Sequence, residues 1–218
     1  MDRTKICYIA GGGTNYGLNF TPRPQDMVIA ADAGLLCLKE AGICADCIIG
    51  DFDSLSYVPE GANVTALSPE KDETDMYAAI RTGIEKGYDL FFLYGGTGGR
   101  TDHTIANFQI IAGLARQGRQ GFLFEKDTVI TAIRNDTLSF QAVPSGYVSV
   151  FSHSETSVGV TLKGLKYPLH EAVLENTFPL GVSNEFAGKE SSITVKDGTL
   201  LIVLPKEALG ACLNAGHA

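Results

Sequence analysis

Two aspartates directly after an apolar run are the first residues of this sequence that could do chemistry. Asp51 and Asp53 follow Ile48–Gly50, which is typical of the end of a buried strand. Side chains two residues apart on a strand point to the same side, so these carboxylates would repel each other by about 1 to 4 kcal/mol. A shared Mg²⁺ would offset that repulsion. An isolated D-x-D-S is more often a solvated turn, so the rest of the chain has to decide.

A second polar segment, "KDETD" at Lys71–Asp75, opens a predicted helix. Taken alone it is most simply a helix start, in which Asp72 or Thr74 caps the first turn. Asp75 would then favour the positive end of the helix dipole. The same residues would also suit a phosphate and metal centre, so both interpretations stay open at this point.

A glycine-rich segment, "GGTGGRTDH" at Gly95–His103, offers backbone N–H groups that could approach a phosphate. Arg100 and Asp102 follow it at the start of another predicted helix. The simpler alternative is a glycine loop with Asp102 as the helix cap. An earlier segment, "GGGTN" at Gly11–Asn15, fails the dinucleotide fingerprint G-x-G-x-x-G because Tyr16 stands at its last position. No P-loop motif occurs either.

These residues need a scaffold, and up to about residue 120 short apolar runs alternate with helical patterns. Such alternation predicts a mostly parallel, Rossmann-like sheet covered by helices, with the ligand beyond the carboxyl ends of the strands. Asp32 ends one predicted strand, and Asp51 and Asp53 end the next. The predicted strands are 5–10, 27–32, 47–51, 63–67 and 89–95. The predicted helices are 35–42, 74–87 and 103–118. The apolar stripe of the last helix is expected to run through Ile105, Phe108, Ile111 and Ala115.

The second half has a different texture, because apolar runs come at short spacing with turn residues between them. This pattern predicts an all-β sandwich or jelly-roll, with "KDGT" at Lys196–Thr199 as a hairpin turn. We therefore predict an α/β domain over 1–122 and a β-sandwich domain over 123–218.

Composition narrows the function classes. The 218 residues are 44% hydrophobic and carry a net charge of −8 with a pI near 5.0, which argues against nucleic acid as a partner. No apolar run is long enough for a signal peptide or a membrane span, so we expect a cytoplasmic protein that does not engage membranes. The five cysteines form an odd, scattered set, and reduced thiols are expected.

Four motifs in this order, "ADAG", "GDFDS", "KDETD" and "GGRTDH", resemble those of the thiamine pyrophosphokinase family, and the likeness extends to "GVSNEF" at Gly181–Phe186. The resemblance implies an α/β nucleotide-binding domain, a β-sandwich domain and a homodimer. It also implies that Mg²⁺-dependent chemistry transfers diphosphate from ATP to the hydroxyl of thiamine and releases AMP.

The resemblance also implies roles for individual residues. The aspartates would hold Mg²⁺ and act with Arg100 in catalysis, the glycine loop would hold ATP, and the second domain would hold thiamine. The implied residues are Asp51, Asp53, Asp75 and Asp102 for the metal; Arg100, Lys71, Thr74, Asp32, Gly98 and Gly99 for ATP; and Ser183, Asn184 and Phe186 for thiamine. Because the chain has no Trp, any ring that stacks on thiamine must come from Phe or Tyr.

Two alternatives remain at this point. One is a nucleotide or vitamin sensor that uses the same fold without turnover, although tight binding alone gains little from so many carboxylates. The other is a metal-dependent phosphohydrolase in which Asp51 acts as the nucleophile and water as the acceptor. In that alternative "GGRTDH" has no evident task.

Overall fold

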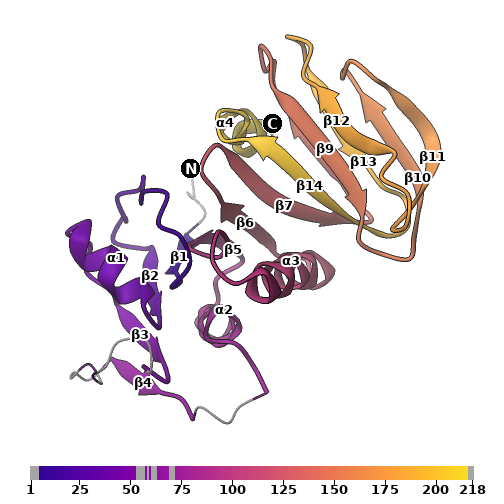
Figure 1. The fold of residues 1–218 in the computed structure, drawn as a ribbon. Coiled ribbons are helices and arrows are strands. Elements are labelled where there is room, and N and C mark those ends of the chain that lie inside the picture. Colours follow the sequence, from indigo (N-terminus) through magenta and orange to yellow (C-terminus); the bar gives the residue numbers. More distant parts are fainter. Residues whose placement is uncertain (1–4, 53–56, 58, 60–62, 69–71, 216–218) are drawn as a thin grey trace. The chain divides into compact units, whose positions relative to one another are not determined.

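The computed structural model describes residues 5–52, 57, 59, 63–68 and 72–215, and it divides into two compact units (Figure 1). The first unit comprises Met1–Ile110 and Gly121–Lys126. The second comprises Ile111–Gln120 and Asp127–Ala218. The chain therefore leaves the first unit within a helix and returns to it for one strand before the second unit is completed.

The first unit is built on a sheet whose strand order is β6-β5-β1-β2-β3-β4. The pairs β4–β3, β3–β2, β2–β1 and β1–β5 are all parallel, as the alternation of strands and helices predicts. The elements are β1 (Ile6–Ala10), β2 (Met27–Ala31), α1 (Gly34–Glu40), β3 (Cys47–Gly50), β4 (Val64–Ala66), α2 (Asp75–Glu85), β5 (Leu90–Tyr94), α3 (Thr101–Arg116) and β6 (Gln120–Phe124).

The register of these strands brings their carboxyl ends to one edge. Ala10 pairs with Ala30 on one side and with Tyr94 on the other, and Gly50 pairs with Ala66. Helix α2 packs against β1, β2 and β3. It lies close to the sheet at Gly83, where an added Cβ would come within 2.6 Å of the Phe91 ring. The segments that follow β1, β2, β3 and β5 therefore meet at the same edge of the sheet.

The buried face of α3 differs from the predicted one. Ile105 was expected in the apolar stripe but is 55% exposed. The buried stripe runs instead through Asn107, Ile111 and Leu114, which are spaced at one helical turn. The prediction for Ile105 was wrong because a pattern of apolar residues gives no weight to a buried polar residue such as Asn107.

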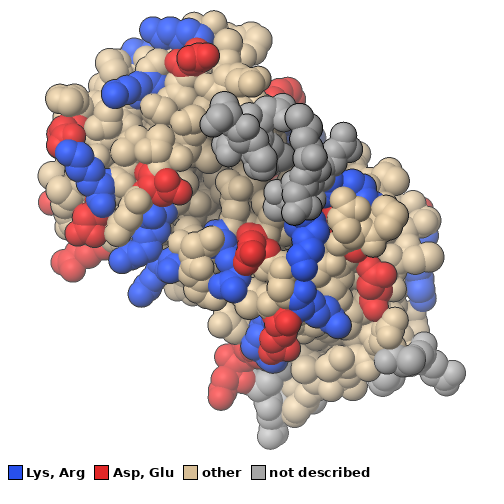
Figure 2. Space-filling model, turned by 180° about the vertical axis from the view of Figure 1, so that it is seen from behind, with Lys and Arg blue, Asp and Glu red and all other residues tan. Residues whose placement is uncertain are grey.

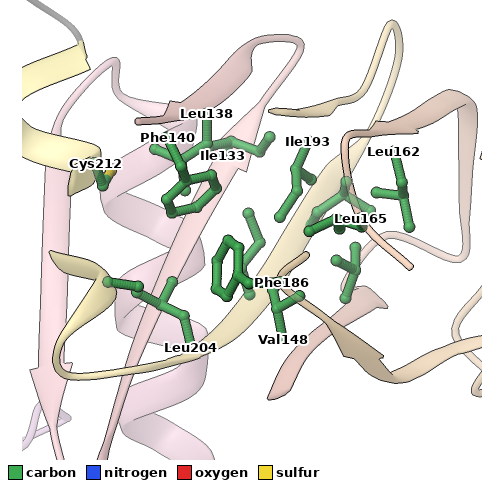
Figure 3. Packing of buried hydrophobic residues seen from close by; sticks show 14 of the residues in the cluster. Ile133, Leu138, Phe140, Val148, Leu162, Leu165, Phe186, Ile193, Leu204 and Cys212 are labelled. Atoms are coloured by element: carbon green, nitrogen blue, oxygen red, sulfur yellow. The ribbon is translucent and has the colours of Figure 1, made fainter. Parts of the chain in front are cut away.

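The second unit contains two antiparallel arrangements of strands, β12-β9-β14-β7 and β11-β10-β13-β8. Their apolar side chains share one core with helix α4, in which the Phe140 and Phe186 rings meet edge to face 5.2 Å apart (Figure 3). The elements are β7 (Thr128–Arg134), β8 (Thr137–Phe140), β9 (Tyr147–Ser152), β10 (Thr156–Lys163), β11 (Leu169–Glu175), β12 (Gly181–Glu185), β13 (Ser191–Thr194), β14 (Thr199–Pro205) and α4 (Ala208–Ala215).

The coarse prediction of a mostly parallel α/β sheet and a separate antiparallel sheet is confirmed, with two corrections. The segment Lys196–Thr199 is no hairpin, because β13 pairs with β8 and β10 whereas β14 pairs with β7 and β9. It carries the chain from one sheet to the other. Helix α4 was not expected in a half that reads as all-β.

Acidic and basic side chains are interspersed over the face of the molecule shown in Figure 2. Among the helices of the described residues, none combines the length and apolar character needed to cross a membrane. All five cysteines are free thiols.

Candidate functional site

The acidic part of the site begins where β2 and β3 end side by side. The Asp32 amide donates to the Ile49 carbonyl at 2.8 Å, and an added Cβ on Gly50 would stand 3.0 Å from the Asp32 Cα. Glycine at position 50 therefore permits the close approach of the two strand ends. Asp32 has a φ of +48°, and its Oδ1 is buried without a hydrogen-bond partner in the described residues. Such a carboxylate oxygen needs a donor or a cation from outside the described protein atoms.

The path of the chain after β3 differs from the strand-based expectation. Phe52 has a φ of +61° and is 3% exposed, so the chain turns there and its side chain is buried. The simple alternation that placed Asp51 and Asp53 on one side of a strand stops at Gly50. Asp51 follows β3 directly, whereas Asp53 lies outside the described residues.

Helix α2 begins at the same edge. The Thr74 hydroxyl accepts a hydrogen bond from the Tyr77 amide at 3.2 Å, which makes Thr74 the N-cap of α2. Asp75 occupies the first turn, where the helix dipole favours a negative charge. The helix-start interpretation of this segment is therefore realised, with Thr74 rather than Asp72 as the cap. Lys71 lies outside the described residues.

Two glycine-rich segments lie against each other at the ends of β1 and β5. The Gly13 amide donates to the Gly95 carbonyl at 2.8 Å. A Cβ on Gly13 would lie 2.5 Å from that same carbonyl oxygen, and one on Gly98 would lie 2.5 Å from the Thr14 hydroxyl. Close backbone contact therefore requires glycine on both sides. This contact, and not a dinucleotide fingerprint, explains the "GGGT" sequence after β1.

The second of these segments, Gly95–Gly99, is called here the glycine loop, and its carbonyl and amide groups differ in their hydrogen bonding. The carbonyl oxygens of residues 95–98 accept hydrogen bonds from the protein, whereas the amides of residues 96–99 donate none within the part of the chain that the structure describes. The four bonds to carbonyls run from Gly13 N to Gly95 O (2.8 Å), Asn107 Nδ2 to Gly96 O (2.7 Å), Thr14 N to Thr97 O (2.9 Å) and Thr14 Oγ1 to Gly98 O (2.7 Å). A row of free amides before the N-terminus of α3 suits a phosphate group.

Arg100 and Asp102 follow the glycine loop and bind each other. Nη2 of Arg100 lies 2.6 Å from Oδ2 of Asp102, and Nε lies 3.2 Å from Oδ1. Their side chains are 72% and 63% exposed. The hydrogen bond from Arg100 holds the pKa of Asp102 below its usual value, and the same bond raises the pKa of Arg100. Both groups are therefore charged at neutral pH.

A metal ion would need ligands drawn from several segments. Among the described residues, no three His, Cys, Asp or Glu side chains converge closely enough to hold one. The buried Oδ1 of Asp32 lies beside β3, the strand that ends directly before Asp51. This position suits a metal centre in which the cation arrives together with the substrate. Asp75 and Asp102 each lie in the first turn of a helix that begins at this edge.

The predicted thiamine residues of the second unit lie on β12 and just beyond it. Asn184 is 4% exposed, and its amide is bonded to one neighbour in both directions: Oδ1 accepts from the Tyr167 amide at 3.0 Å and Nδ2 donates to the Tyr167 carbonyl at 2.7 Å. This side chain fixes the backbone of the β10–β11 connection. Tyr167, whose backbone it holds, is 54% exposed, and the centre of its ring lies 5.3 Å from the Lys166 Nζ.

The other two predicted thiamine residues differ in exposure. Ser183 is exposed with a φ of +57°, within a bulge where β12 shifts register against β9. Phe186 is 4% exposed and packs in the core against Phe140, so its ring is not available at the surface. Exposed neighbours of this segment are Tyr147, opposite Glu185 on β9, and Lys166, whose Nζ lies 2.6 Å from the Glu185 carboxylate.

A groove of about 670 Å³ lies elsewhere on the first unit. Its walls include Phe20, Val28 and Ile43, together with Asp26 and Asp46, which precede β2 and β3. In a parallel sheet this is the edge opposite to the acidic segments. Asp26 is already bound by Arg23 through two contacts of 2.8 Å. This groove therefore does not contain the predicted site residues.

Sequence reasoning missed three residues that shape the site: Thr14, Asn107 and Tyr167. The signal for Asn107 is present, because a polar residue that stands one helical turn from Ile111 and two from Leu114 lies on a buried stripe. Thr14 and Tyr167 give no such signal, since the Thr14 hydroxyl bonds the Gly98 carbonyl and the Tyr167 backbone bonds the Asn184 side chain, each more than ten residues away.

Comparison with known families gives two matches along the chain. A family model described as "Thiamin pyrophosphokinase, catalytic domain" matches residues 22–123, and one described as "Thiamin pyrophosphokinase, vitamin B1 binding domain" matches residues 137–200. The first match contains the acidic segments and the glycine loop. The second contains Tyr167 and Asn184.

Known thiamine pyrophosphokinases resemble the chain over nearly its whole length. A curated thiamine pyrophosphokinase of Bacillus subtilis is 28% identical over 208 residues, which cover 91% of this chain and 97% of the relative. A crystal structure of thiamine pyrophosphokinase from Bacillus subtilis has a TM-score of 0.81 at 26% identity and covers 92% and 99% of the two chains. One from Geobacillus thermodenitrificans has a TM-score of 0.80 at 28% identity, with 95% and 99% covered.

Proposed function

Because this chain belongs to the thiamine pyrophosphokinase family, we infer that it transfers a diphosphate group from ATP to the hydroxyl of thiamine and releases AMP. The observation that carries this function to the residues is the glycine loop: the carbonyls of residues 95–98 are bound to the protein, whereas the amides of residues 96–99 donate to no atom of the described residues. It lies before α3 at the carboxyl edge of a parallel sheet, where ligands of such folds bind. A polyphosphate is the ligand that this arrangement suits.

We propose that the amides of Gly98 and Gly99 and the guanidinium of Arg100 bind the phosphates of ATP. The planar fork of an arginine makes two hydrogen bonds to a phosphate, which a lysine cannot match. In the reaction the thiamine hydroxyl oxygen bonds to the β-phosphorus, the bond from that phosphorus to the α-phosphate oxygen breaks, and AMP leaves. The hydroxyl proton passes to a site carboxylate or to water. Arg100 stabilises the charge that grows on the phosphate oxygens.

We propose that Asp51, Asp53, Asp75 and Asp102 hold Mg²⁺, with Asp32, Thr74 and Lys71 on the nucleotide side. Support comes from the placement of Asp51, Asp75 and Asp102 at one edge of the sheet and from the buried oxygen of Asp32, which has no hydrogen-bond partner among the described residues. A bound Mg²⁺ would neutralise polyphosphate charge. The pairing of Asp102 with Arg100 implies that both side chains reorient when substrate binds.

On the thiamine side, we propose that Ser183 and the exposed ring of Tyr167 contact the acceptor, with Asn184 acting by holding Tyr167 in place. Thiamine carries a cationic thiazolium, which favours contact with an aromatic face at about 0.5 to 2 kcal/mol. Tyr167 supplies such a face in a chain without Trp. Phe186 is buried, so its part would be limited to packing beneath β12.

We further propose a cytoplasmic homodimer in which the first domain, 1–122, binds nucleotide and the β-sandwich domain, 123–218, binds thiamine and forms the dimer. Four apolar side chains of β11, β12 and the segment between them are exposed, which favours an interface. They are Val173 (52% exposed), Phe178 (63%), Leu180 (47%) and Val182 (48%). Sedimentation of the protein and of a Phe178→Asp variant tests this, since a dimer that uses this patch dissociates in the variant.

One incubation with thiamine, ATP and Mg²⁺ tests the function. We expect thiamine diphosphate and AMP in equal amounts. ADP formed in step with product would mean attack at the γ-phosphorus, free phosphate would indicate a hydrolase, and binding without turnover would indicate a sensor. No observation favours these alternatives. Asp51→Ala and Asp75→Ala are expected to lower turnover by at least about 100-fold with folding intact, and near-normal rates in both would overturn the metal assignment.

A further inference from the structure

Two of the four hydrogen bonds that hold the glycine loop come from side chains, which lie on separate segments. Asn107 reaches the Gly96 carbonyl from the second turn of α3, and Thr14 reaches the Gly98 carbonyl from the segment after β1. The two carbonyls are two residues apart in the loop. Each is held by a donor atom that makes no other hydrogen bond to the described residues.

An asparagine at position 107 lowers the stability of the fold unless its side chain makes a compensating interaction. It is 5% exposed on the buried face of a helix, where asparagine has poor helix propensity and loses its hydration. Its side-chain amide nitrogen donates to the Gly96 carbonyl at 2.7 Å, and this hydrogen bond offsets part of the free energy lost with its hydration. An apolar residue would fill the position at lower cost if packing were the sole requirement.

The direction of a loop carbonyl decides whether the loop accepts an anion. A carbonyl oxygen turned toward a phosphate repels it, whereas an amide turned toward it attracts it. A glycine loop can flip its peptide planes easily, because glycine tolerates both signs of φ. Gly95 and Gly98, with φ of +62° and +77°, occupy conformations that few other residues adopt.

We propose that Asn107 and Thr14 are positioning residues for the nucleotide: they hold the carbonyls of Gly96 and Gly98 away from the ligand so that the loop amides face the polyphosphate. Neither residue touches ATP. The inference rests on the proposed function in that it takes ATP as the ligand of this loop. It predicts that loss of either donor weakens ATP binding selectively and leaves thiamine binding unchanged.

Thr14→Val and Thr14→Ser form the sharper test. Valine keeps the shape of threonine without the hydroxyl, and serine keeps the hydroxyl. Thr14 is exposed, so neither change threatens folding. We expect Thr14→Val to raise the ATP Kd, measured by calorimetry, about 5- to 20-fold, the scale of one hydrogen bond. Thr14→Ser is expected to stay within about twofold of the unmodified protein, by the same reasoning.

Asn107→Asp tests the second donor, since it keeps the shape but sets a carboxylate against a carbonyl. We expect an ATP Kd raised by at least about 10-fold. The control is Gln117→Glu, the same change of amide to acid directly after the same helix, where Gln117 donates to the Gly113 carbonyl at 3.3 Å. It is expected to leave the ATP Kd unchanged.

The outcomes separate this inference from the proposed function. If the unmodified protein binds ATP and makes thiamine diphosphate, but Thr14→Val and Asn107→Asp only lower the melting temperature and leave the ATP Kd unchanged, the residues are merely structural and the inference is overturned. Equal loss of ATP and thiamine binding overturns it as well. If the unmodified protein does not bind ATP, the proposed function fails and the inference fails with it. A rise in the ATP Kd alone for Thr14→Val and Asn107→Asp, with a normal ATP Kd for Thr14→Ser, supports both the inference and the proposed function.

Discussion

Arg100 and Asp102 bind each other through two contacts, at 2.6 Å between Nη2 and Oδ2 and at 3.2 Å between Nε and Oδ1. The proposed function gives these residues separate partners, a phosphate for Arg100 and Mg²⁺ for Asp102. Without substrate each neutralises the other, which relieves the repulsion of Asp102 by other carboxylates. Both side chains are largely exposed, so the pair contributes little to stability and exchanges readily for substrate contacts.

The first prediction is that Arg100→Lys lowers kcat by about 100-fold, because the fork of two donors that matches a phosphate is lost although the charge remains. Steady-state rates with thiamine and ATP measure it. The control is Arg81→Lys, which alters another exposed arginine, 48% against 72% for Arg100, that is paired with Glu73 and Glu85. It should retain at least half the activity. A kcat for Arg100→Lys within about threefold of normal would remove Arg100 from the transition state.

The second prediction concerns the acid titration of Asp102. The hydrogen bond from Arg100 lowers its pKa from the ordinary value of 3.8, so Arg100→Met should raise that pKa. Carboxylate chemical shifts followed by NMR between pH 2 and 7 measure the change. An unchanged pKa would mean that the pair does not form in solution.

The third prediction compares two adjacent glycines. Gly98 has a φ of +77°, and a Cβ there would lie 2.5 Å from the Tyr16 hydroxyl, whereas a Cβ on Gly99 meets nothing closer than 3.8 Å. Gly98→Ala should therefore lower the free energy of unfolding by about 1 to 3 kcal/mol. Gly99→Ala should change it by less than about 0.5 kcal/mol. Urea unfolding measures both, and equal losses would contradict the contact between the two glycine segments.

The acidic edge was predictable because it depends on local signals. The runs before Asp32 and Asp51 are apolar and short, and parallel strands bring whatever follows them to one edge. Glycine-rich turns and helix starts are likewise read from neighbouring residues. The family resemblance then assigned roles that spacing alone leaves open.

What the sequence did not reveal depends on contacts between distant segments. Strand β11 is largely exposed, and neither β11 nor β12 shows a clean alternation of buried and exposed residues, so the sequence pattern does not reveal either strand. The sequence predicts that Asn184 is a polar residue that binds the ligand directly. Its hydrogen bonds to the Tyr167 backbone indicate instead that it holds that segment in place. The "KDGT" turn signal was real, but which sheet each flanking strand joins is decided by tertiary packing.

The fourth prediction concerns Asp26, whose side chain is fully buried beneath Arg23. Burial by itself would raise its pKa, but hydrogen bonds from Arg23 and from the Ile6 amide outweigh that effect and hold the pKa below 3.8. Asp26 therefore stabilises the fold above about pH 4 and loses this contribution as pH falls through its folded pKa. Asp26→Asn should cost about 2 to 3 kcal/mol at pH 7.

Urea unfolding of the Asp26→Asn variant and the unmodified protein at pH 7, 5, 4 and 3 measures this dependence. The difference in unfolding free energy should be constant between pH 7 and 5 and should narrow toward pH 3. Asp46→Asn is the control, because Asp46 also accepts a strand amide, from Val28 at 2.8 Å, but is exposed. Its loss should stay below about 1 kcal/mol. A difference for Asp26→Asn that widens on acidification would reverse the assigned sign.

The last prediction separates the support of the thiamine site from its contact surface. If Tyr167 faces the thiazolium and Asn184 only holds its backbone, Tyr167→Phe should keep thiamine affinity within about twofold, because the ring face remains. Tyr167→Ala should weaken it about 5- to 30-fold, the scale of one cation–π contact. Asn184→Ala should match Tyr167→Ala in thiamine affinity but also lower the melting temperature, because it removes the side chain that bonds two part-buried backbone groups of Tyr167. The ATP Kd should stay unchanged in all three variants.

A double variant, Tyr167→Ala with Asn184→Ala, tests whether Asn184 acts through the Tyr167 ring. If it does, the double variant binds thiamine no worse than either single variant. If Asn184 contacts thiamine directly, the two losses multiply, and the supporting role assigned to it is wrong.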